Sequence, residues 1–404
     1  VVVEDSSILE ELYGENGARS GTVENATLLK DISEGSGGSN PQQLFAHTDG
    51  NLYFSAGGKC WSSDGTEEGT VPFYDSHCTF FSSLGDTLFF AIDSEDYGWE
   101  LHSYDGSSEP VIVKDIWDEE NGHGEQMNGI DTNNLNTPML WPVSVNDEFL
   151  LFTARNESNN NELWRTDGTE DGTYMVKDIN TDGDGYPSHF FSLDEDRVLF
   201  RAQPNAGNNR QLWITDGTEV GTYRLKDINP GDDALIDWFT KHNDQVYFMA
   251  KTGDYSDSPR ELWTTDGTQA GTYAITNPAD FDLLYPAVPV GDILIFKADG
   301  LGSYGEELYK YNPATEEVSL VIDMEPGSDD SNVNIRFTLG NDLFFTHWND
   351  TTYDYAMWKT DGTEEGTSKF FDQGSFDLAI GSLVHRSPTS REQPHFETYV
   401  PSFD

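Results

Sequence analysis

The stretch Trp61-Ser62-Ser63-Asp64-Gly65-Thr66, followed by Gly69-Thr70, decides the fold because it returns along the chain after strand-like segments. Its general form is Trp-x-x-Asp-Gly-Thr-x-x-Gly-Thr, and successive copies lie roughly 40 to 60 residues apart. That period is typical of a four-stranded sheet repeated as the blades of a β-propeller. Further copies are Trp164–Thr173, Trp213–Thr222, Trp263–Thr272 and Trp358–Thr367, with degenerate versions at Leu101–Ser107 and Leu308–Thr315.

Each repeat is predicted to form four strands. The first is a short apolar run that ends in a turn such as Asn243-Asp244, whose residues tolerate positive φ. The second is aromatic, as in Tyr247-Phe248, and its adjacent apolar residues indicate a sheet covered on both faces. The third carries Glu-Leu-Trp and the fourth resembles Tyr223–Ile228. Seven complete sets predict units at about residues 42–76, 78–116, 140–180, 187–229, 235–277, 284–323 and 334–372.

The two ends of the chain hold incomplete repeats that complement each other. Residues 19–32 contain a fourth strand, Leu28–Ile32, with no earlier strands, and residues 375–404 read as three strands with no fourth. We therefore expect one all-β propeller over residues 19–404, with eight blades and a ring closed by the N-terminal outer strand. Seven blades is the alternative, because the last segment matches the repeat poorly. Residues 1–18 are expected to form an N-terminal arm.

The charge balance restricts the partners. The chain has 404 residues, of which 73 are acidic and 22 basic, giving a net charge of −51. Such a surface repels nucleic acid and anionic membranes, and no apolar run approaches the length of a membrane span. Because the first residue is Val, we expect a removed signal or a longer precursor and an extracellular or cell-surface location. The expected partners are an extracellular protein or glycan, or further copies of the chain in a larger surface structure.

The two cysteines, Cys60 and Cys78, fall on adjacent predicted blades. In a secreted protein they would form a disulfide that closes a short loop. Two unpaired buried thiols are the alternative.

Several phrases resemble a known family. Glu162–Thr169, Gln211–Thr218 and Glu261–Thr268 are similar to the bacterial ELWxxDGT repeat, and Gly221–Gly231 continues the same pattern. The resemblance runs from about residue 20 to residue 372. It implies a β-propeller-like repeat in large secreted or cell-surface proteins and brings no catalytic mechanism. The second and sixth units depart from the motif at Tyr104–Ser107 and Tyr311–Ala314, which leaves their turn geometry open.

The Asp-Gly-Thr turns have two interpretations. They would either form a ring of cation-binding acids, or be structural turns in which Asp caps the backbone and Gly takes positive φ. Recurrence in many repeats favours the structural turn. For the same reason we expect the repeated Trp to pack between blades.

Acidic loops after the fourth strands are the candidate metal sites. Asp178-x-Asn180-x-Asp182-Gly183 matches the first half of a calcium loop, although His189 stands where the final Glu would be. Calcium is therefore the expected cofactor, and a solvated acidic turn is the alternative. The candidate ligands are Asp178, Asn180, Asp182, Asp184, Asp227, Asn229, Asp233, Asp323 and Asp329.

A second candidate site lies where the axial channel of a propeller should open. His77, Trp141, His189 and Trp238 stand near the starts of first strands and would bind a ligand there, or fill the channel. We find no Ser-His-Asp signature, phosphate loop, zinc pattern or nucleotide fingerprint, so we assign no catalytic residue.

Two functions follow from these patterns. The first is a secreted, non-enzymatic propeller scaffold for extracellular binding or adhesion to protein or glycan, stabilised by calcium. The second is a secreted carbohydrate-active enzyme, a glycoside hydrolase or lyase, with its site at the channel mouth. The second rests on analogy between folds, so we lean towards a protein without enzymatic activity.

Overall fold

The computed structural model describes residues 28–33, 37–94, 98–116, 142–155, 160–207, 209–253, 258–300, 305–325, 330–349 and 354–372. Within these ranges the regular structure consists of β-strands, which confirms the predicted all-β class. No helix in this described part has the length and apolarity needed to cross a membrane. The predicted arm at residues 1–18 and the last segment at residues 375–404 lie outside the described residues.

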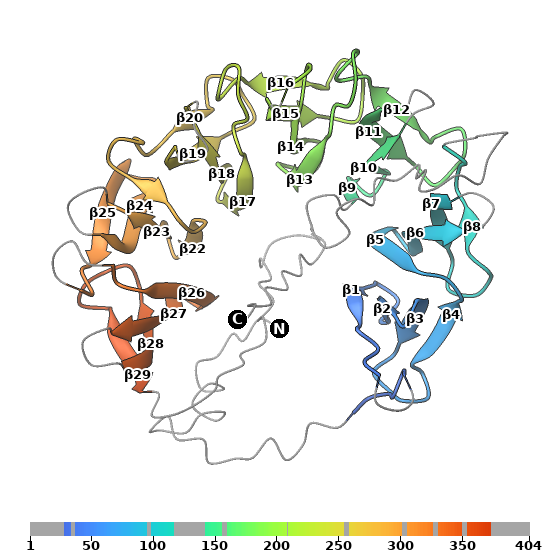
Figure 1. Cartoon of the computed structure of the whole chain (residues 1–404), viewed down its shortest axis with the longest axis horizontal. Helices are drawn as coiled ribbons and strands as arrows, with labels where there is room; N and C mark the ends of the chain where they lie inside the picture. Colours follow the sequence, from blue (N-terminus) through green and yellow to red (C-terminus); the bar gives the residue numbers. More distant parts are fainter. Residues whose placement is uncertain are drawn as a thin grey trace. The chain divides into compact units, whose positions relative to one another are not determined.

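In the described residues the strands form seven antiparallel sheets, whose strands are labelled in Figure 1. The chain divides into two compact units, and each is described by itself. The N-terminal unit, residues 26–233, holds four of the sheets. In each, the strands are hydrogen-bonded in chain order. They are β1 (Gln42–Ala46), β2 (Leu52–Ala56), β3 (Lys59–Ser63) and β4 (Val71–Tyr74); β5 (Cys78–Leu84), β6 (Thr87–Ser94), β7 (Gly98–Tyr104) and β8 (Val111–Ile112); β9 (Val143–Val145), β10 (Phe149–Arg155), β11 (Asn161–Thr166) and β12 (Tyr174–Lys177); and β13 (Ser188–Ser192), β14 (Val198–Ala202), β15 (Gln211–Thr215) and β16 (Tyr223–Lys226).

The C-terminal unit, residues 1–25 and 234–404, holds the other three sheets. The middle one has five strands, because β21 and β22 both pair with β23. The strands are β17 (Asp237–His242), β18 (Gln245–Lys251), β19 (Arg260–Thr265) and β20 (Tyr273–Ala274); β21 (Asp282–Leu283), β22 (Val288–Val290), β23 (Ile293–Asp299), β24 (Glu306–Asn312) and β25 (Glu317–Ile322); and β26 (Val333–Leu339), β27 (Asp342–Asn349), β28 (Asp354–Thr360) and β29 (Ser368–Asp372).

A cross-strand pair of aromatic rings marks the middle of the repeated sheet. Phe200 on β14 stands directly opposite Trp213 on β15, and their ring centroids are 6.2 Å apart. The first strand bulges at this level, since both His189 and Phe190 oppose Phe200. The third and fourth strands shift register beside Trp213. The same Phe–Trp pairing joins Phe54 to Trp61, Phe152 to Trp164, Phe248 to Trp263 and Phe345 to Trp358.

The hydrophobic cores lie between consecutive sheets of a unit. Phe152 and Trp164 pack with Phe89 and Leu101 of the preceding sheet. Their neighbours Leu151 and Leu163 pack with Phe200 and Trp213 of the following sheet. Successive residues of one strand thus face two different cores, which is why adjacent apolar residues replace strict alternation. This confirms that the repeated Trp packs between sheets.

The Asp-Gly-Thr phrase closes the turn between the third and fourth strands with a fixed set of hydrogen bonds. Thr218 donates both its backbone N–H and its hydroxyl to Asp216 Oδ1, at 2.9 and 2.7 Å. Gly217 has a φ of +79°, which favours glycine, and Gly221 donates its N–H to Thr218 Oγ1 at 3.0 Å. These bonds confirm the structural interpretation of the turn.

The second and sixth repeats, which depart from the motif, form the same kind of turn with other residues. Asp105 Oδ1 accepts backbone N–H bonds from Ser107 and Ser108, both at 2.9 Å. These bonds lower the pKa of Asp105 to about 2, with the Ser108 backbone as the largest cause. Asn312 Oδ1 accepts the N–H of Ala314 at 3.0 Å.

We predict that Gly221→Ala lowers the free energy of unfolding by about 1–3 kcal/mol. A Cβ at Gly221 would overlap the carboxylate of Asp216, so the turn would have to open. Urea unfolding measures the loss. The matched control is Gly38→Ala, where a Cβ meets no heavy atom within 4 Å and the change should stay within about 0.5 kcal/mol. Equal losses in the two variants would contradict the prediction.

Candidate functional site

Four first strands carry a non-glycine residue in the left-handed conformation at the same place. These residues stand in the bulge opposite the central Phe of the second strand. Their φ angles are +58° at Gln43, +59° at Phe80, +59° at His189 and +58° at Trp238. Such a conformation costs on the order of 1–3 kcal/mol for a residue with a Cβ, and strained residues of this kind cluster at functional sites. Because bulges also redirect side chains, the bulge position is the candidate site in each of these four sheets.

Trp238 is the most accessible of the four. Its side chain is 37% exposed and stacks on Tyr285, which is 39% exposed, with ring centroids 6.4 Å apart and an interplanar angle of 25°. Tyr285 follows β21 and donates its N–H to Lys297 O at 3.2 Å, which fixes the backbone below the ring. Leu284 beside it is 41% exposed. The C-terminal unit therefore presents a small aromatic surface, made of Trp238, Leu284 and Tyr285.

His77, another predicted ligand residue, lies outside these bulges. His77 precedes β5 and contacts Trp99 with ring centroids 5.4 Å apart. Burial lowers the pKa of His77, and Asp93 nearby opposes this effect. Both His77 and His189 lie at the start of a first strand, but the bulge in the second sheet places Phe80, and not His77, at the position of His189. The sequence does not show where a bulge falls.

The predicted site at a channel mouth stays a prediction. Trp141 lies outside the described residues. His189 belongs to the N-terminal unit and Trp238 to the C-terminal unit, and we describe each within its own unit. His189 itself is buried, with 7% of its surface exposed.

The acidic loops use several of their predicted calcium ligands as internal caps. Asn180 donates its side-chain amide to Asp184 O at 2.8 Å, and Asp184 Oδ1 accepts the N–H of Asn161 at 2.8 Å. Asn229 repeats the first bond with Asp233 O at 3.1 Å. Each loop thereby ties itself to the start of a third strand.

The remaining acids of these loops do not gather into a cluster. Asp178 and Asp182 are exposed, and Asp227 pairs with Arg224 at 3.2 Å. Asp233 pairs with Arg210 at 3.1 Å. Asp329 lies outside the described residues, whereas Asp323 is partly buried. Among the described residues, no three His, Cys, Asp or Glu side chains are grouped so as to hold a metal ion, and calcium binding stays a prediction.

The sequence interpretation missed the buried acid that begins the Glu-Leu-Trp phrase. Glu162 and Glu307 are fully buried, and each accepts a backbone N–H from the loop after the fourth strand. Burial raises the pKa of each side chain to about 8. The available signal was Gln211, which replaces the acid in one repeat.

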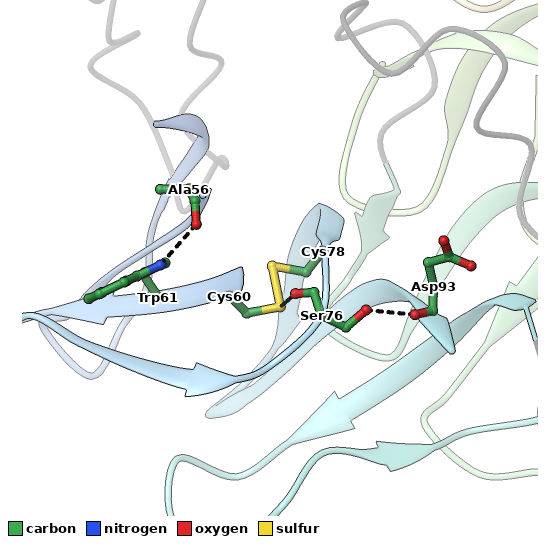
Figure 2. Close-up of a disulfide and its surroundings, with 6 residues drawn as sticks. All are labelled: Ala56, Cys60, Trp61, Ser76, Cys78 and Asp93. Carbon is green, nitrogen blue, oxygen red and sulfur yellow. Dashed lines mark hydrogen bonds between the residues drawn. A yellow bond between two sulfur atoms is a disulfide. The ribbon is translucent and has the colours of Figure 1, made fainter. Parts of the chain in front are cut away.

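The predicted disulfide is present between Cys60 on β3 and Cys78 on β5 (Figure 2). Their Cα atoms are 5.6 Å apart, a normal separation for a disulfide, and both side chains are fully buried. Figure 2 also shows Ser76 donating to Asp93 O at 2.6 Å, which holds the connection between the two sheets. The bond therefore links the first two sheets of the N-terminal unit.

We predict that replacing both Cys60 and Cys78 with Ala lowers the free energy of unfolding by about 3 kcal/mol, because the loop between them is no longer closed in the unfolded chain. Chemical unfolding measures this loss. A reducing agent should destabilise the natural protein and leave the double variant unchanged. A reducing agent that destabilises both proteins equally would count against a structural role for this bond.

Comparisons with known proteins give a likeness of fold only. No protein-family model matches the chain, and no curated protein matches it. It resembles the solved structure of oligopeptidase B from Leishmania major with a TM-score of 0.44 and 10% identity, covering 87% of this chain and 51% of that one. Prolyl oligopeptidase B from Galerina marginata gives a TM-score of 0.44 and 12% identity, covering 82% and 50%. A structure from a study of two prolyl endopeptidases gives 0.42 and 13%, covering 82% and 49%.

These comparisons correct the function expected from the sequence. The chain spans about half the length of these solved structures, which are peptidases. The prediction of a non-enzymatic extracellular adhesion scaffold, with a carbohydrate-active enzyme as its alternative, is therefore contradicted. It rested on the scaffold-like repeat and the acidic surface, and neither feature identifies a function.

Proposed function

We propose that the chain forms a β-propeller domain that frames the approach of peptides to a peptidase catalytic centre on another domain or chain. The proposed substrate class, peptides, comes from the peptidases named above. We assign no catalytic residue to the described part of the chain. The disulfide between Cys60 and Cys78 supports an oxidising, extracellular location.

We further propose that the sheets are blades of an eight-bladed ring closed by the N-terminal strand. The supporting observation is a repeated lysine contact between neighbouring sheets. Lys177 after the third sheet donates to Glu219 O in the turn of the fourth, at 3.1 Å. Lys114 after the second sheet donates to Glu170 O in the turn of the third, at 3.3 Å.

Lys30 makes the same contact although no sheet precedes it in the described residues. It donates to Glu67 O at 3.0 Å, and Glu67 directly follows the Asp-Gly-Thr of the first sheet, as Glu170 and Glu219 do in theirs. Ile32 packs against Phe54 and Trp61 of the first sheet. Residues 28–33 are not in a strand in the structure, so the predicted strand Leu28–Ile32 is not present, but Lys30 and Ile32 make contacts like those expected from the end of a preceding blade.

The aromatic surface of Trp238, Leu284 and Tyr285 supports contact with peptides. Exposed stacked rings suit proline rings and extended peptide backbone, which dock on aromatic surfaces without further ordering. The net charge of −51 attracts cationic peptides, and a Lys or Arg side chain over the Trp238 ring adds a cation–π interaction. The proposed ligand is therefore a proline-containing peptide of positive charge.

Deletion variants test ring closure. Removing residues 1–18 should leave the melting temperature unchanged, whereas removing residues 1–33 should lower it because Lys30 and Ile32 lose their contacts with the first sheet. Removing residues 375–404 should cause a similar loss. If both ends complete one blade, removing both should cost little more than removing either. Losses that simply add would overturn the closed ring.

Binding of synthetic peptides tests the role of the domain. We expect a cationic proline-containing peptide to bind more tightly than its acidic counterpart in calorimetry. Trp238→Ala should weaken this binding about tenfold, the equivalent of about 1.4 kcal/mol. Tyr223→Ala, which removes another exposed ring at 48% exposure, is the matched control and should bind like the natural protein.

Mass spectrometry of the same mixtures separates binding from catalysis. The peptide should remain intact, since the proposed catalytic centre lies outside this domain. Cleavage by the purified chain alone, removed neither by repurification nor by protease inhibitors of contaminants, would overturn that assignment. Absence of binding, or equal loss in both ring variants, would overturn the peptide contact.

A further inference from the structure

The loop after β12 is fastened by one buried side chain. Glu162 on β11 accepts the N–H of Ile179 at its Oε2 atom, at 2.7 Å. The contact is close-fitting, because a Cβ at Gly185 would lie 2.6 Å from Oε2 and 2.9 Å from Oε1. Yet Oε1 is buried and has no hydrogen-bond partner of normal geometry among the described residues, although the backbone N–H groups of Asn180 and Gly185 lie close enough to the carboxylate to oppose the rise of its pKa. An ionised carboxylate in this position would leave a charge with an unsatisfied oxygen in the interior.

The next repeat shows which hydrogen bonds are available at the position of Glu162 Oε1. Gln211 replaces the acid and accepts the N–H of Ile228 at its Oε1 atom, at 2.8 Å, as Glu162 does from Ile179. Its Nε2 donates to Asn229 O at 2.9 Å and to Asp232 O at 2.8 Å. The two loops have the same internal bonds, since Asn180 and Asn229 each donate to the carbonyl four residues later. The place of Glu162 Oε1 therefore faces hydrogen-bond acceptors.

Glu307 presents the same arrangement in the C-terminal unit. Its Oε2 accepts the N–H of Met324 at 3.3 Å, and its Oε1 is buried without a partner among the described residues. Ser331 at the end of that loop also hydrogen-bonds to Glu307. In two separate sheets a buried acid thus accepts a backbone N–H at Oε2, while its Oε1 has no partner of normal hydrogen-bond geometry among the described residues.

The charged groups near each acid favour its neutral form. Around Glu162 these are Asp178, whose charge raises the pKa of Glu162, and Asp184 in the same loop. Arg155 on β10 donates to Asn161 Oδ1, at 3.3 Å. Lys177 is directed away, to Glu219 O.

The surroundings of Glu307 are similar. Asp323 acts on it with the same sign of charge. Lys297 on β23 is paired with Glu306 at 2.6 Å, and Glu325 is paired with His347 at 3.3 Å.

We propose that Glu162 and Glu307 are neutral carboxylic acids in the folded protein at neutral pH, each donating its proton to one carbonyl of the following loop. Each acid then makes one of the two donor bonds that the Gln211 amide makes in its own repeat, and keeps the acceptor bond. Each acid thereby fastens one loop, Glu162 the loop before β13 and Glu307 the loop before β26, by a hydrogen bond that depends on pH. We call this hydrogen bond the latch. The β12–β13 loop contains the left-handed residue Tyr186, and the left-handed His189 follows at the start of β13, so the latch lies next to the bulge of that sheet.

The direction of the pH effect follows from the position of the proton. Burial raises the pKa of Glu162 to about 8, well above its ordinary value of 4.5. The folded state therefore holds more protons than the unfolded state between these two values, and stability falls as the pH rises through that interval. Above about pH 8 the latch has lost its donor.

The decisive experiment compares melting temperatures of the natural protein, Glu162→Gln and Gln211→Glu between pH 5 and pH 9. Glu162→Gln should match the natural protein near pH 5 and exceed it by a few degrees at pH 9, because the amide keeps its N–H donor. Gln211→Glu should do the reverse, with a melting temperature that falls below that of the natural protein only as the pH rises. Both substitutions preserve side-chain shape, so a folding defect at all pH values is not expected.

Two further measurements separate a proton from other occupants. Infrared spectroscopy at neutral pH should show a protonated carboxyl band that disappears in the Glu162→Gln, Glu307→Gln double variant. Melting temperatures with and without millimolar calcium should show no effect that depends on Glu162. A pH-independent difference between natural protein and Glu162→Gln, or a calcium-dependent rise that the variant abolishes, would overturn the proposal.

Discussion

The structure depends on the cross-strand aromatic pair at the centre of five of the seven described sheets. A Phe on the second strand and a Trp on the third, such as Phe248 and Trp263, fill space between neighbouring strands and are buried. Their size forces the flanking strands to adjust, so the first strand bulges opposite the Phe and the fourth shifts beside the Trp. The left-handed residues of the first strands are a consequence of this packing, because surrounding burial is what holds a strained backbone in place.

Buried polar groups then fix the segments that the aromatic pair leaves free. Each loop from a fourth strand to the next first strand lacks regular pairing, so its backbone N–H and C=O groups need other partners. Glu162 or Gln211 supplies them from the third strand, and Asn180 or Asn229 from within the loop. The desolvation of an acid is tolerated here because a carboxylic acid, like an amide, offers both a donor and an acceptor.

The period of the sequence made the sheets, the aromatic strands and the Asp-Gly-Thr turn predictable, since all three recur with one spacing. The disulfide followed from two cysteines on adjacent units. The position of Phe80 was not predictable, because a bulge depends on which residues pair and no single residue type marks it. The acid of Glu162 was visible as part of the motif, yet its burial and missing partner are properties of packing that the sequence does not state.

The distinction between repeated and varied residues also bears on where function lies. Residues that recur in most sheets, such as the Trp and the turn Asp, are explained by the packing and hydrogen bonds they make. At the bulge the backbone is the same in four sheets, with φ near +58°, but the side chains are Gln43, Phe80, His189 and Trp238. Since a common conformation accepts four different chemistries, packing alone does not select the residue there. The proposed peptide contact would supply such a selection for the exposed member, Trp238, whose ring stacks on Tyr285 from a separate sheet.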